Sequence, residues 1–249
     1  MFALISDLHA NLSALEAVLR RIEELGIPEV CCLGDLVGYG PDPEACIDLV
    51  RERCRFTLRG NHDLGCIEGS LHEFNPLARE SLLWTRKRLR PRLLSPRSKR
   101  RWDFLAKLPE RVDRDGMTFV HASPRDPIRE YVLKSDGFLD PEKLEANFAR
   151  IEGPCFVGHT HQPGFTTRDY RFHQATSDRL VWDLPQEPCI VNVGSVGQPR
   201  DGDPRACFLV VDEGRLLYQR VEYDLRRTQQ RILEEHLSPY LAERLALGR

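Results

Sequence analysis

The N-terminal segment from Ala3 to His9 ends in two residues that could bind one metal ion, Asp7 and His9. It begins with an apolar run that is typical of a short buried strand. Side chains two positions apart on an extended segment project to the same side, so both residues can face one point. A carboxylate oxygen and an imidazole nitrogen are common ligands of a divalent cation. One Asp-x-His is a weak signal, and its interpretation depends on what the rest of the chain supplies.

Four further apolar segments, each predicted to be a strand, also end in polar residues. They are followed by Asp35, by Asn61-His62-Asp63, by His121 and by His159-Thr160-His161. Together with His9 of the first segment, five of the eight histidines lie at these strand ends. An isolated histidine is usually an ordinary core or surface residue, but five at successive strand ends indicate one shared site.

The elements that must position these residues alternate between strand and helix in the first part of the chain. Apolar residues recur at helical spacing from Leu12 to Leu25, between the first two predicted strands. The strand-helix-strand-helix-strand order predicts parallel strands with right-handed crossovers, and α/β proteins place ligands at the C-terminal ends of such strands. Beyond residue 115 short strands are favoured, including a hairpin at Asp212-Glu213-Gly214. The pattern alone predicts an α/β fold with a parallel first half and a β-rich second half.

Residues 64–115 are predicted to be helices separated by prolines, and they contain a basic run between Arg86 and Arg101. This run is either a solvated helical face or a positive rim that attracts phosphorylated substrates, and the sequence leaves both open. A helix from about residue 225 to 247 is expected to end the chain.

The composition of the chain limits the classes of protein to which it can belong. Its 249 residues are 41% hydrophobic and 30% charged, which is typical of a globular protein. The formal net charge of −2 argues against a general nucleic-acid binder. No apolar run reaches the roughly 18 residues that a membrane span needs, and no signal peptide is apparent, so we expect a cytoplasmic protein. The eight cysteines form no C-x-x-C pair and are expected to be reduced core residues.

Five motifs of the chain, in their order, resemble those of the calcineurin-like metallophosphoesterases. They are Asp-x-His, Gly-Asp, Gly-Asn-His-Asp, a strand-end His and Gly-His-x-His. The resemblance extends from residue 1 to about residue 223, and the segments 121–131 and 192–200 resemble its small prokaryotic phosphodiesterase branch. That branch is called diadenosine-tetraphosphatase-like or protein-phosphatase-like. The resemblance implies a four-layer α/β/β/α sandwich with two mixed β-sheets, formed by one domain over residues 1–249. Residues 64–115 would then form a helical flap over the metals.

The resemblance also implies two divalent metal ions, which could be Mn, Fe, Co or Zn because all of these accept mixed oxygen and imidazole ligands. For the first metal it implies the ligands Asp7, His9, Asp35 and His161. For the second it implies Asp35, Asn61, His121 and His159, so that Asp35 bridges. The implied activity is hydrolysis of phosphodiester or phosphoanhydride bonds in small phosphorylated or nucleotide substrates, through attack by a metal-bridging hydroxide.

His62 lies beside Asn61 and is not assigned to a metal. We expect it to act as a general acid or to stabilise the transition state, with Asp63 orienting its imidazole. A purely structural histidine is the alternative.

Substrate contacts are predicted more weakly, at Asn11, Tyr39, Arg125 and Arg200. Asn11 could instead cap a helix, Tyr39 could simply pack, and Arg125 could form an ion pair with a nearby carboxylate. A serine/threonine-type protein phosphatase, a nuclease and a catalytically silent scaffold are the alternative functions. Neither a membrane nor a nucleic acid is expected as a partner, and the sequence does not indicate an oligomeric state.

Overall fold

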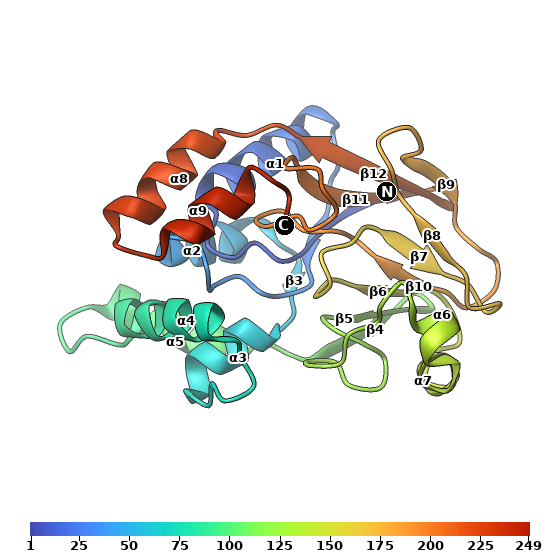
Figure 1. Cartoon of the computed structure of the whole chain (residues 1–249), viewed down its shortest axis with the longest axis horizontal. Coiled ribbons are helices and arrows are strands. Elements are labelled where there is room, and N and C mark those ends of the chain that lie inside the picture. The colour runs from blue at the N-terminus through green and yellow to red at the C-terminus, as the bar shows by residue number, and fades with distance from the viewer.

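Two six-stranded mixed sheets pack face to face in the computed structural model, which describes residues 1–249 (Figure 1). The first sheet has the strand order β3-β2-β1-β11-β12-β9. Its strands are β1 (Phe2–Ile5), β2 (Val30–Cys32), β3 (Phe56–Thr57), β9 (Val181–Asp183), β11 (Ala206–Asp212) and β12 (Arg215–Val221). As predicted, β1, β2 and β3 are parallel, and β11 and β12 form the hairpin.

The second sheet has the strand order β4-β5-β6-β10-β7-β8. Its strands are β4 (Arg111–Arg114), β5 (Met117–Val120), β6 (Cys155–Val157), β7 (Gly164–Thr166), β8 (Phe172–Gln174) and β10 (Ile190–Asn192). Strands β5, β6 and β10 are parallel neighbours, so the residues that follow them emerge at the same edge of this sheet.

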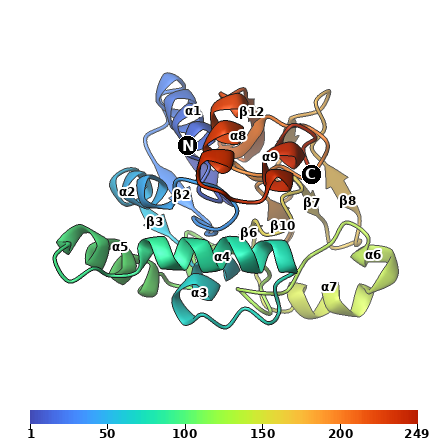
Figure 2. The same cartoon turned by 60° about the vertical axis from the view of Figure 1, so that its left-hand side comes forward.

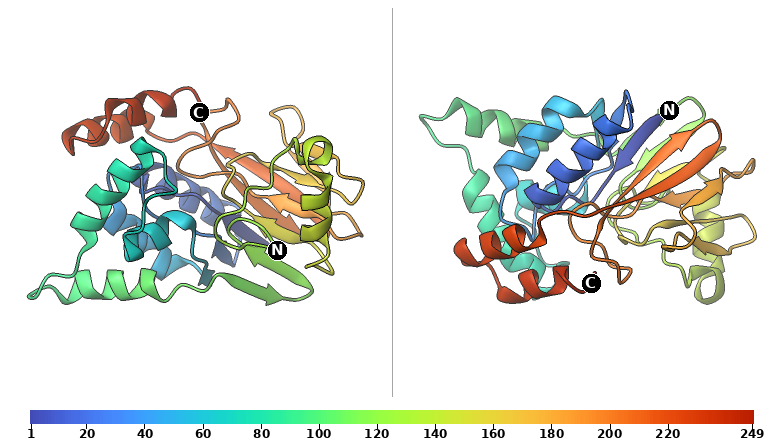
Figure 3. Two further views of the ribbon diagram at one scale, coloured as in Figure 1. Left: turned by 60° about the horizontal axis from the view of Figure 1, so that its bottom comes forward. Right: turned by 90° about the horizontal axis from the view of Figure 1, so that it is seen from above.

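Nine helices surround the sheets. They are α1 (Leu12–Glu24), α2 (Pro43–Arg53), α3 (Asn61–Glu68), α4 (Pro76–Leu89), α5 (Pro96–Ala106), α6 (Asp136–Leu139), α7 (Pro141–Phe148), α8 (Leu225–Glu234) and α9 (Pro239–Leu245). Helices α1 and α2 cover the outer face of the first sheet, and α6 and α7 lie against the second (Figures 1 and 3). Helices α3, α4 and α5 gather at one end of the molecule (Figure 2).

The alternation of side chains along the short strands explains this layering. In β1, Ala3 and Ile5 pack against the helices, whereas Leu4 points into the space between the sheets. That inner layer also contains Phe119 and Phe156, whose rings stack with centroids 5.3 Å apart. Both faces of each sheet are therefore covered, and the four-layer α/β/β/α sandwich is confirmed.

Two expected helical regions have different boundaries in the structure. The single C-terminal helix expected over about 225–247 is two helices, α8 and α9, separated by residues 235–238. Pro239 is the first residue of α9, and a proline disfavours helical backbone in the residue before it, so the first helix must end upstream. Residues 111–114 are strand β4 and not part of a helical flap.

The remaining expectations from composition concern cysteines and membranes. All eight cysteines are unpaired thiols, and only Cys54 is not fully buried. No helix in the protein combines the length and the apolar character that crossing a bilayer requires.

Candidate metal centre

The side chains predicted to bind metal lie together where β1, β2, β5 and β6 end and where α3 begins. Two buried groups have ligand atoms within 4.8 Å of one another and match the two predicted metals. They are Asp7 with His9 and His161, and Asp35 with His121 and His159. We call these two groups, with Asn61, the cage.

The backbone is unusual at the cage. Five of its residues have a positive φ, between 45° and 63°: Asp7, His9, Asp35, His159 and His161. This conformation costs residues other than glycine roughly 1–2 kcal/mol each. Such strain persists where the surrounding structure fixes it, and it concentrates at functional sites. The chain therefore turns sharply after β1, β2 and β6, at residues that carry candidate ligands.

Two glycines allow the carboxylates to approach the backbone closely. A Cβ at Gly60 would lie 2.0 Å from Oδ1 of Asp35, and a Cβ at Gly158 would lie 2.5 Å from Oδ2 of Asp7. Both distances are far shorter than a van der Waals contact, so any larger residue would displace the carboxylate. The glycines in the Gly-Asn-His-Asp and Gly-His-x-His motifs thus position Asp35 and Asp7.

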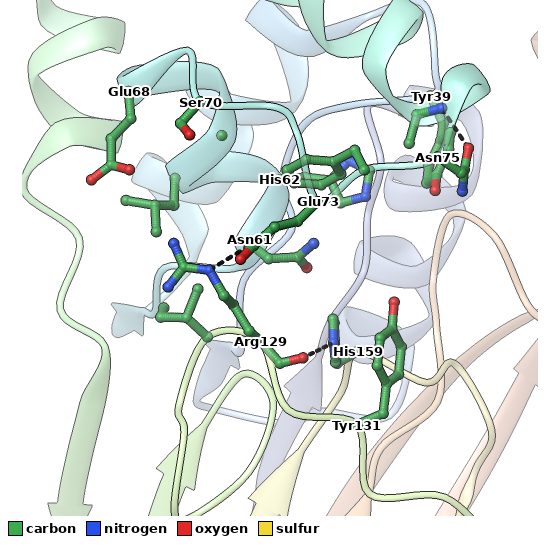
Figure 4. Close-up of a pocket in the computed structure, with 15 residues that line it drawn as sticks. Tyr39, Asn61, His62, Glu68, Ser70, Glu73, Asn75, Arg129, Tyr131 and His159 are labelled. Carbon is green, nitrogen blue, oxygen red and sulfur yellow. Dashed lines mark hydrogen bonds and ion pairs between the residues drawn. The ribbon is translucent and has the colours of Figure 1, made fainter.

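Each cage histidine has one ring nitrogen close to a backbone carbonyl oxygen. In three of them Nδ1 makes this contact, at 3.3 Å for His9, 2.9 Å for His121 and 2.5 Å for His161. In His159 it is Nε2, which lies 3.0 Å from the carbonyl oxygen of Arg129 (Figure 4). A carbonyl oxygen only accepts, so the proton of the neutral ring is on that nitrogen. The other nitrogen of a neutral ring can then act as an acceptor toward the cage, as in metal-binding histidines. On His121 this nitrogen carries a proton until a metal replaces it.

The arrangement of lone pairs fits a cation. Nε2 of His9 lies 3.1 Å from Nε2 of His161, and Oδ1 of Asp7 lies 3.3 Å from the same His161 nitrogen. With both rings donating through Nδ1, these three atoms are acceptors that face one another. Their mutual repulsion is relieved by a positive ion between them, so the residues present suit a divalent metal.

Asp35 lies between the two groups of the cage. Its Oδ2 is 3.8 Å from Nε2 of His9 and 3.4 Å from Nε2 of His121. Its Oδ1 accepts a hydrogen bond from the backbone N–H of His62 at 2.8 Å. Asn61 adds its side-chain oxygen, 3.3 Å from Nε2 of His121. The Asp35 carboxylate therefore faces the histidines of both groups with one oxygen, while its other oxygen is fixed by the backbone N–H of His62.

The charges of the metal-free cage follow from burial and from these contacts. Burial opposes ionisation of Asp7 and Asp35, but neighbouring histidines outweigh it and hold both pKa values below their usual range. Burial lowers the pKa of His159 to about 3. Burial acts the same way on His121, but the Asp35 carboxylate prevails and raises its pKa to about 9. Anionic carboxylates are thus available as metal ligands at neutral pH.

His62 is buried beside the cage, and the expected contact with Asp63 is absent. Nδ1 of His62 has no hydrogen-bond partner, and burial lowers the pKa of the ring to about 4. The Asp63 carboxylate instead accepts from the backbone N–H groups of Leu36 (2.9 Å), Val37 (3.3 Å) and Gly60 (3.0 Å). The reason is its place in the first turn of α3, from which it reaches back to the loop after β2. Asp63 therefore supports the segment that carries Asp35 and does not orient His62.

A cavity of about 140 Å³ opens beside the cage, between α3, α4 and residues 128–131 (Figure 4). His62 and His159 face it from the cage side. Tyr131 is half exposed at its rim and stacks on the His159 ring at 3.9 Å. Of the expected flap, helices α3 and α4 form a wall of this cavity. Its lining consists of Tyr39, Asn61, His62, Leu64, Gly65, Glu68, Ser70, Glu73, Phe74, Asn75, Ala78, Ile128, Arg129, Tyr131 and His159.

Two of the weaker substrate candidates, Asn11 and Arg125, make the structural contacts that the sequence offered as their alternatives. Asn11 caps α1 by accepting from the N–H of Ala14 at 3.2 Å, and its amide donates to the carbonyl of Gly197 at 2.9 Å. Arg125 is exposed and forms an ion pair with Glu130. In each case the structural alternative accounts for the polar atoms of the side chain.

The other two candidates, Tyr39 and Arg200, lie at the cage. The Tyr39 ring centroid is 4.8 Å from that of His9 and 4.7 Å from that of His62. The guanidinium carbon of Arg200 is 5.9 Å from the centroid of Tyr39.

Four of the nine basic residues in the run 86–101 form ion pairs within the protein. Arg88 forms ion pairs with Glu44 and Glu235, and Arg101 pairs with Asp48. These contacts support the interpretation as a helical face packed on the body.

Sequence reasoning missed the groups that hold the cage from outside. Ser195 donates its hydroxyl to the carbonyl of Asp7 at 2.9 Å, and the carbonyl of Gln198 faces His161. The contact of Tyr131 with His159 was also missed. A backbone carbonyl can belong to any residue type, so the sequence contains no signal for most of these contacts.

Comparisons with known proteins agree with this geometry. The family model described as "Calcineurin-like phosphoesterase superfamily domain" matches residues 1–214. An uncharacterized protein of Methanocaldococcus jannaschii is 35% identical over 257 residues, covering 100% of this chain and 98% of that protein. The crystal structure of a metallophosphoesterase from Sphaerobacter thermophilus has a TM-score of 0.83 at 38% identity, covering 100% of this chain and 98% of its own. A hypothetical protein from Pyrococcus horikoshii OT3 shares the fold, with a TM-score of 0.77 at 22% identity over 100% of this chain and 99% of its own. Because the family model matches most of the chain, and because the Methanocaldococcus jannaschii and Sphaerobacter thermophilus proteins are more than 30% identical to it, the chain belongs to the calcineurin-like phosphoesterase superfamily.

Proposed function

We propose that this protein is a dinuclear metal-dependent phosphoesterase that hydrolyses phosphodiester or phosphoanhydride bonds of small phosphorylated or nucleotide substrates. The observation that carries the proposal is the position of Asp35. One of its carboxylate oxygens lies 3.8 Å from Nε2 of His9 and 3.4 Å from Nε2 of His121, between two buried groups of metal-binding residue types. Two cations bound there would lower the pKa of bound water toward about 7 and neutralise the oxygens of a phosphoryl group.

The two groups of the cage define the proposed ligand sets. Asp7, His9, Asp35 and His161 would hold one cation, and Asp35, Asn61, His121 and His159 the other. The backbone carbonyls fix the ring orientation of each histidine, so little rearrangement is needed when metal binds. Such preorganisation lets the site stabilise developing charge without reorganising during the reaction.

His62 is proposed to act as a neutral hydrogen-bond donor to the reacting phosphoryl group or to the leaving oxygen. Burial lowers its pKa to about 4, so the ring is uncharged at neutral pH. The side chain lines both the cage and the cavity. A neutral imidazole in this position donates from a ring N–H, which favours stabilisation of the transition state over transfer of a proton from a cationic ring.

The cavity supports a small substrate over a nucleic acid. Its lining includes two glutamates, Glu68 and Glu73, and the second forms an ion pair with Arg129 at 2.8 Å. The lining therefore holds one uncompensated negative charge, on Glu68, and no unpaired cationic side chain, so it offers no positive surface to a polyanion that extends away from the cage. The cavity volume of about 140 Å³ suits a small substituent beside the cage.

The experiment is a hydrolysis assay on protein freed of metal with a chelator. Bis-p-nitrophenyl phosphate is the substrate, and Mn, Fe, Co and Zn are added back singly. We expect no turnover without metal and turnover with at least one of them. His121→Ala should lose the response, whereas His72→Ala, a change at an exposed histidine that belongs to none of the ligand groups, should retain it.

If the protein binds metal but does not hydrolyse the substrate with any of the four cations, the proposal is rejected. This result would favour the catalytically silent scaffold that the sequence left as an alternative.

A further inference from the structure

Two arginines lie against the same aromatic ring at the edge of the cage. The guanidinium carbon of Arg200 is 5.9 Å from the ring centroid of Tyr39, and that of Arg244 is 5.7 Å from it. The same ring is 4.8 Å from the ring of His9 and 4.7 Å from that of His62. The ring of Tyr39 therefore lies close to both guanidinium groups, to His9 of the cage and to His62.

Neither arginine is paired with an acidic side chain. Arg200 donates from Nη2 to the side-chain oxygen of Gln198 at 2.8 Å, and its Nε is buried without any partner. Two other arginines differ in this respect: Arg220 forms an ion pair with Asp201, and Arg205 forms one with Asp203. A guanidinium that is partly buried and lacks a carboxylate is costly unless an anion joins it.

Arg244 extends from α9 with most of its donors unused. Its Nε donates to the carbonyl oxygen of Arg249 at 2.6 Å, and the guanidinium also lies 6.0 Å from the ring of Tyr240. Burial and then repulsion from Arg200 lower the pKa of Arg244, which agrees with two like charges held near each other. An anion between the two guanidinium groups would remove that repulsion.

The C-terminal helices hold Arg244 in this place. Tyr39 belongs to one buried cluster with Ile232 of α8 and with Leu241 and Leu245 of α9. The N–H of Gly202, two residues after Arg200, donates to the carbonyl of Gly248 at 3.1 Å. Helices α8 and α9 lie on the same side of the molecule as α4, which walls the cavity (Figures 2 and 3). Both helices also lie beyond residue 214, where the match to the family model ends.

On the basis of the proposed phosphoesterase function, we propose that Arg200 and Arg244 form a subsite for a second phosphate of the substrate. The phosphoryl group that reacts would lie at the cage, and the phosphate linked to it would accept hydrogen bonds from the two guanidinium groups. Planar guanidinium groups suit phosphate oxygens because they donate two parallel hydrogen bonds. The favoured substrates are then those with at least two linked phosphates, and α9 helps to set this preference.

The test compares AMP with ADP, which differ by one phosphate, as competitors of bis-p-nitrophenyl phosphate turnover at a fixed concentration of free Mn. Wild-type protein should bind ADP more tightly than AMP. In Arg244→Gln and in Arg200→Gln, the inhibition constant for ADP should rise about ten- to a hundredfold, the value of a lost charge-assisted contact. The constant for AMP should change much less, and Arg244→Lys should restore part of the ADP affinity.

Arg226→Gln is the matched control, because Arg226 is an exposed arginine of α8 without an ion-pair partner. It should leave both constants unchanged. If the ratio of the inhibition constants for ADP and AMP stays at the wild-type value in Arg244→Gln and Arg200→Gln, the proposed subsite is overturned. An equal rise for both nucleotides would also overturn it, and would place the arginines on the reacting phosphate. Absence of turnover in wild-type protein would reject the proposed function instead, and calorimetry of ADP and AMP on Mn-loaded protein would still test the arginines.

Discussion

Substitution of Gly60 by alanine tests how tightly the position of Asp35 is fixed. The backbone of Gly60 has φ −92° and ψ 172°, so alanine fits there without backbone strain. Its methyl group, however, would lie 2.0 Å from Oδ1 and 2.3 Å from the backbone nitrogen of Asp35. Carbon and oxygen atoms approach to about 3.3 Å at closest in ordinary contacts. The carboxylate must therefore move by more than about 1 Å, which at an active site costs on the order of 10²-fold in rate.

Metal content by mass spectrometry and turnover of bis-p-nitrophenyl phosphate are the two measurements on Gly60→Ala. We expect fewer than two bound metals and about a hundredfold lower kcat, because both proposed metals share Asp35. Gly116→Ala is the control, since Gly116 has φ +74° and no atom within 4 Å of an added Cβ. That change should cost about 1–2 kcal/mol of stability through backbone strain and leave metal and kcat intact. Full metal content with wild-type kcat in Gly60→Ala would refute the assigned role of Asp35.

Three further predictions address the reaction and the fold. His62→Ala should keep both metals and lower kcat by about 10²–10³, the value of a hydrogen-bond donor that acts in the transition state. The loss should be similar for esters with good and with poor leaving groups. A loss confined to poor leaving groups would instead identify His62 as a general acid. Phe156→Ala removes a fully buried ring between the sheets and should lower the free energy of unfolding by about 3–5 kcal/mol in denaturant titrations, and a loss below about 1 kcal/mol would contradict the described packing. Burial lowers the pKa of His62 to about 4 and that of His159 to about 3 from 6.5, so the unfolded chain binds more protons below pH 6.5. The metal-free protein should therefore lose stability as the pH falls from about 6.5 to about 4. Asp63 offsets part of this loss, because burial raises its pKa to about 7 and the folded chain then binds its proton first. A melting temperature that rises as the pH falls through this range would contradict these shifts.

Sequence reasoning located the cage because its residues share a simple signal. A short apolar strand followed by a polar residue can be recognised at all five segments, four of which also have a neighbouring small residue, and parallel strands bring such ends to one edge. The role of Asp63 could not be predicted in the same way, because it depends on where the first turn of α3 points. The carbonyl that faces His159 comes from Arg129, whose side chain has no part in the contact. The proposed second phosphate subsite depends on Arg244, which belongs to no motif and lies more than 40 residues beyond the last of them.

The break between α8 and α9 was readable from the sequence but was missed. Ser238-Pro239 combines a preferred residue for the start of a helix with a proline at its first position. The apolar residues before and after Pro239 continue with helical spacing. This periodicity led to the prediction of one continuous helix, despite the sign of a helix start at Ser238-Pro239. Strand β4 was missed for a different reason: its residues Arg111–Arg114 are mostly exposed and charged at a sheet edge, where the alternation of apolar residues is weak.

The central claim is that side chains from distant parts of the chain form one cage for two cations that share Asp35. Anomalous X-ray diffraction from crystals of this protein grown with Mn tests it most directly. Two anomalous peaks about 3.5–4 Å apart, both in contact with the Asp35 carboxylate, are the predicted result. A single peak, or two peaks of which only one touches Asp35, would contradict the claim.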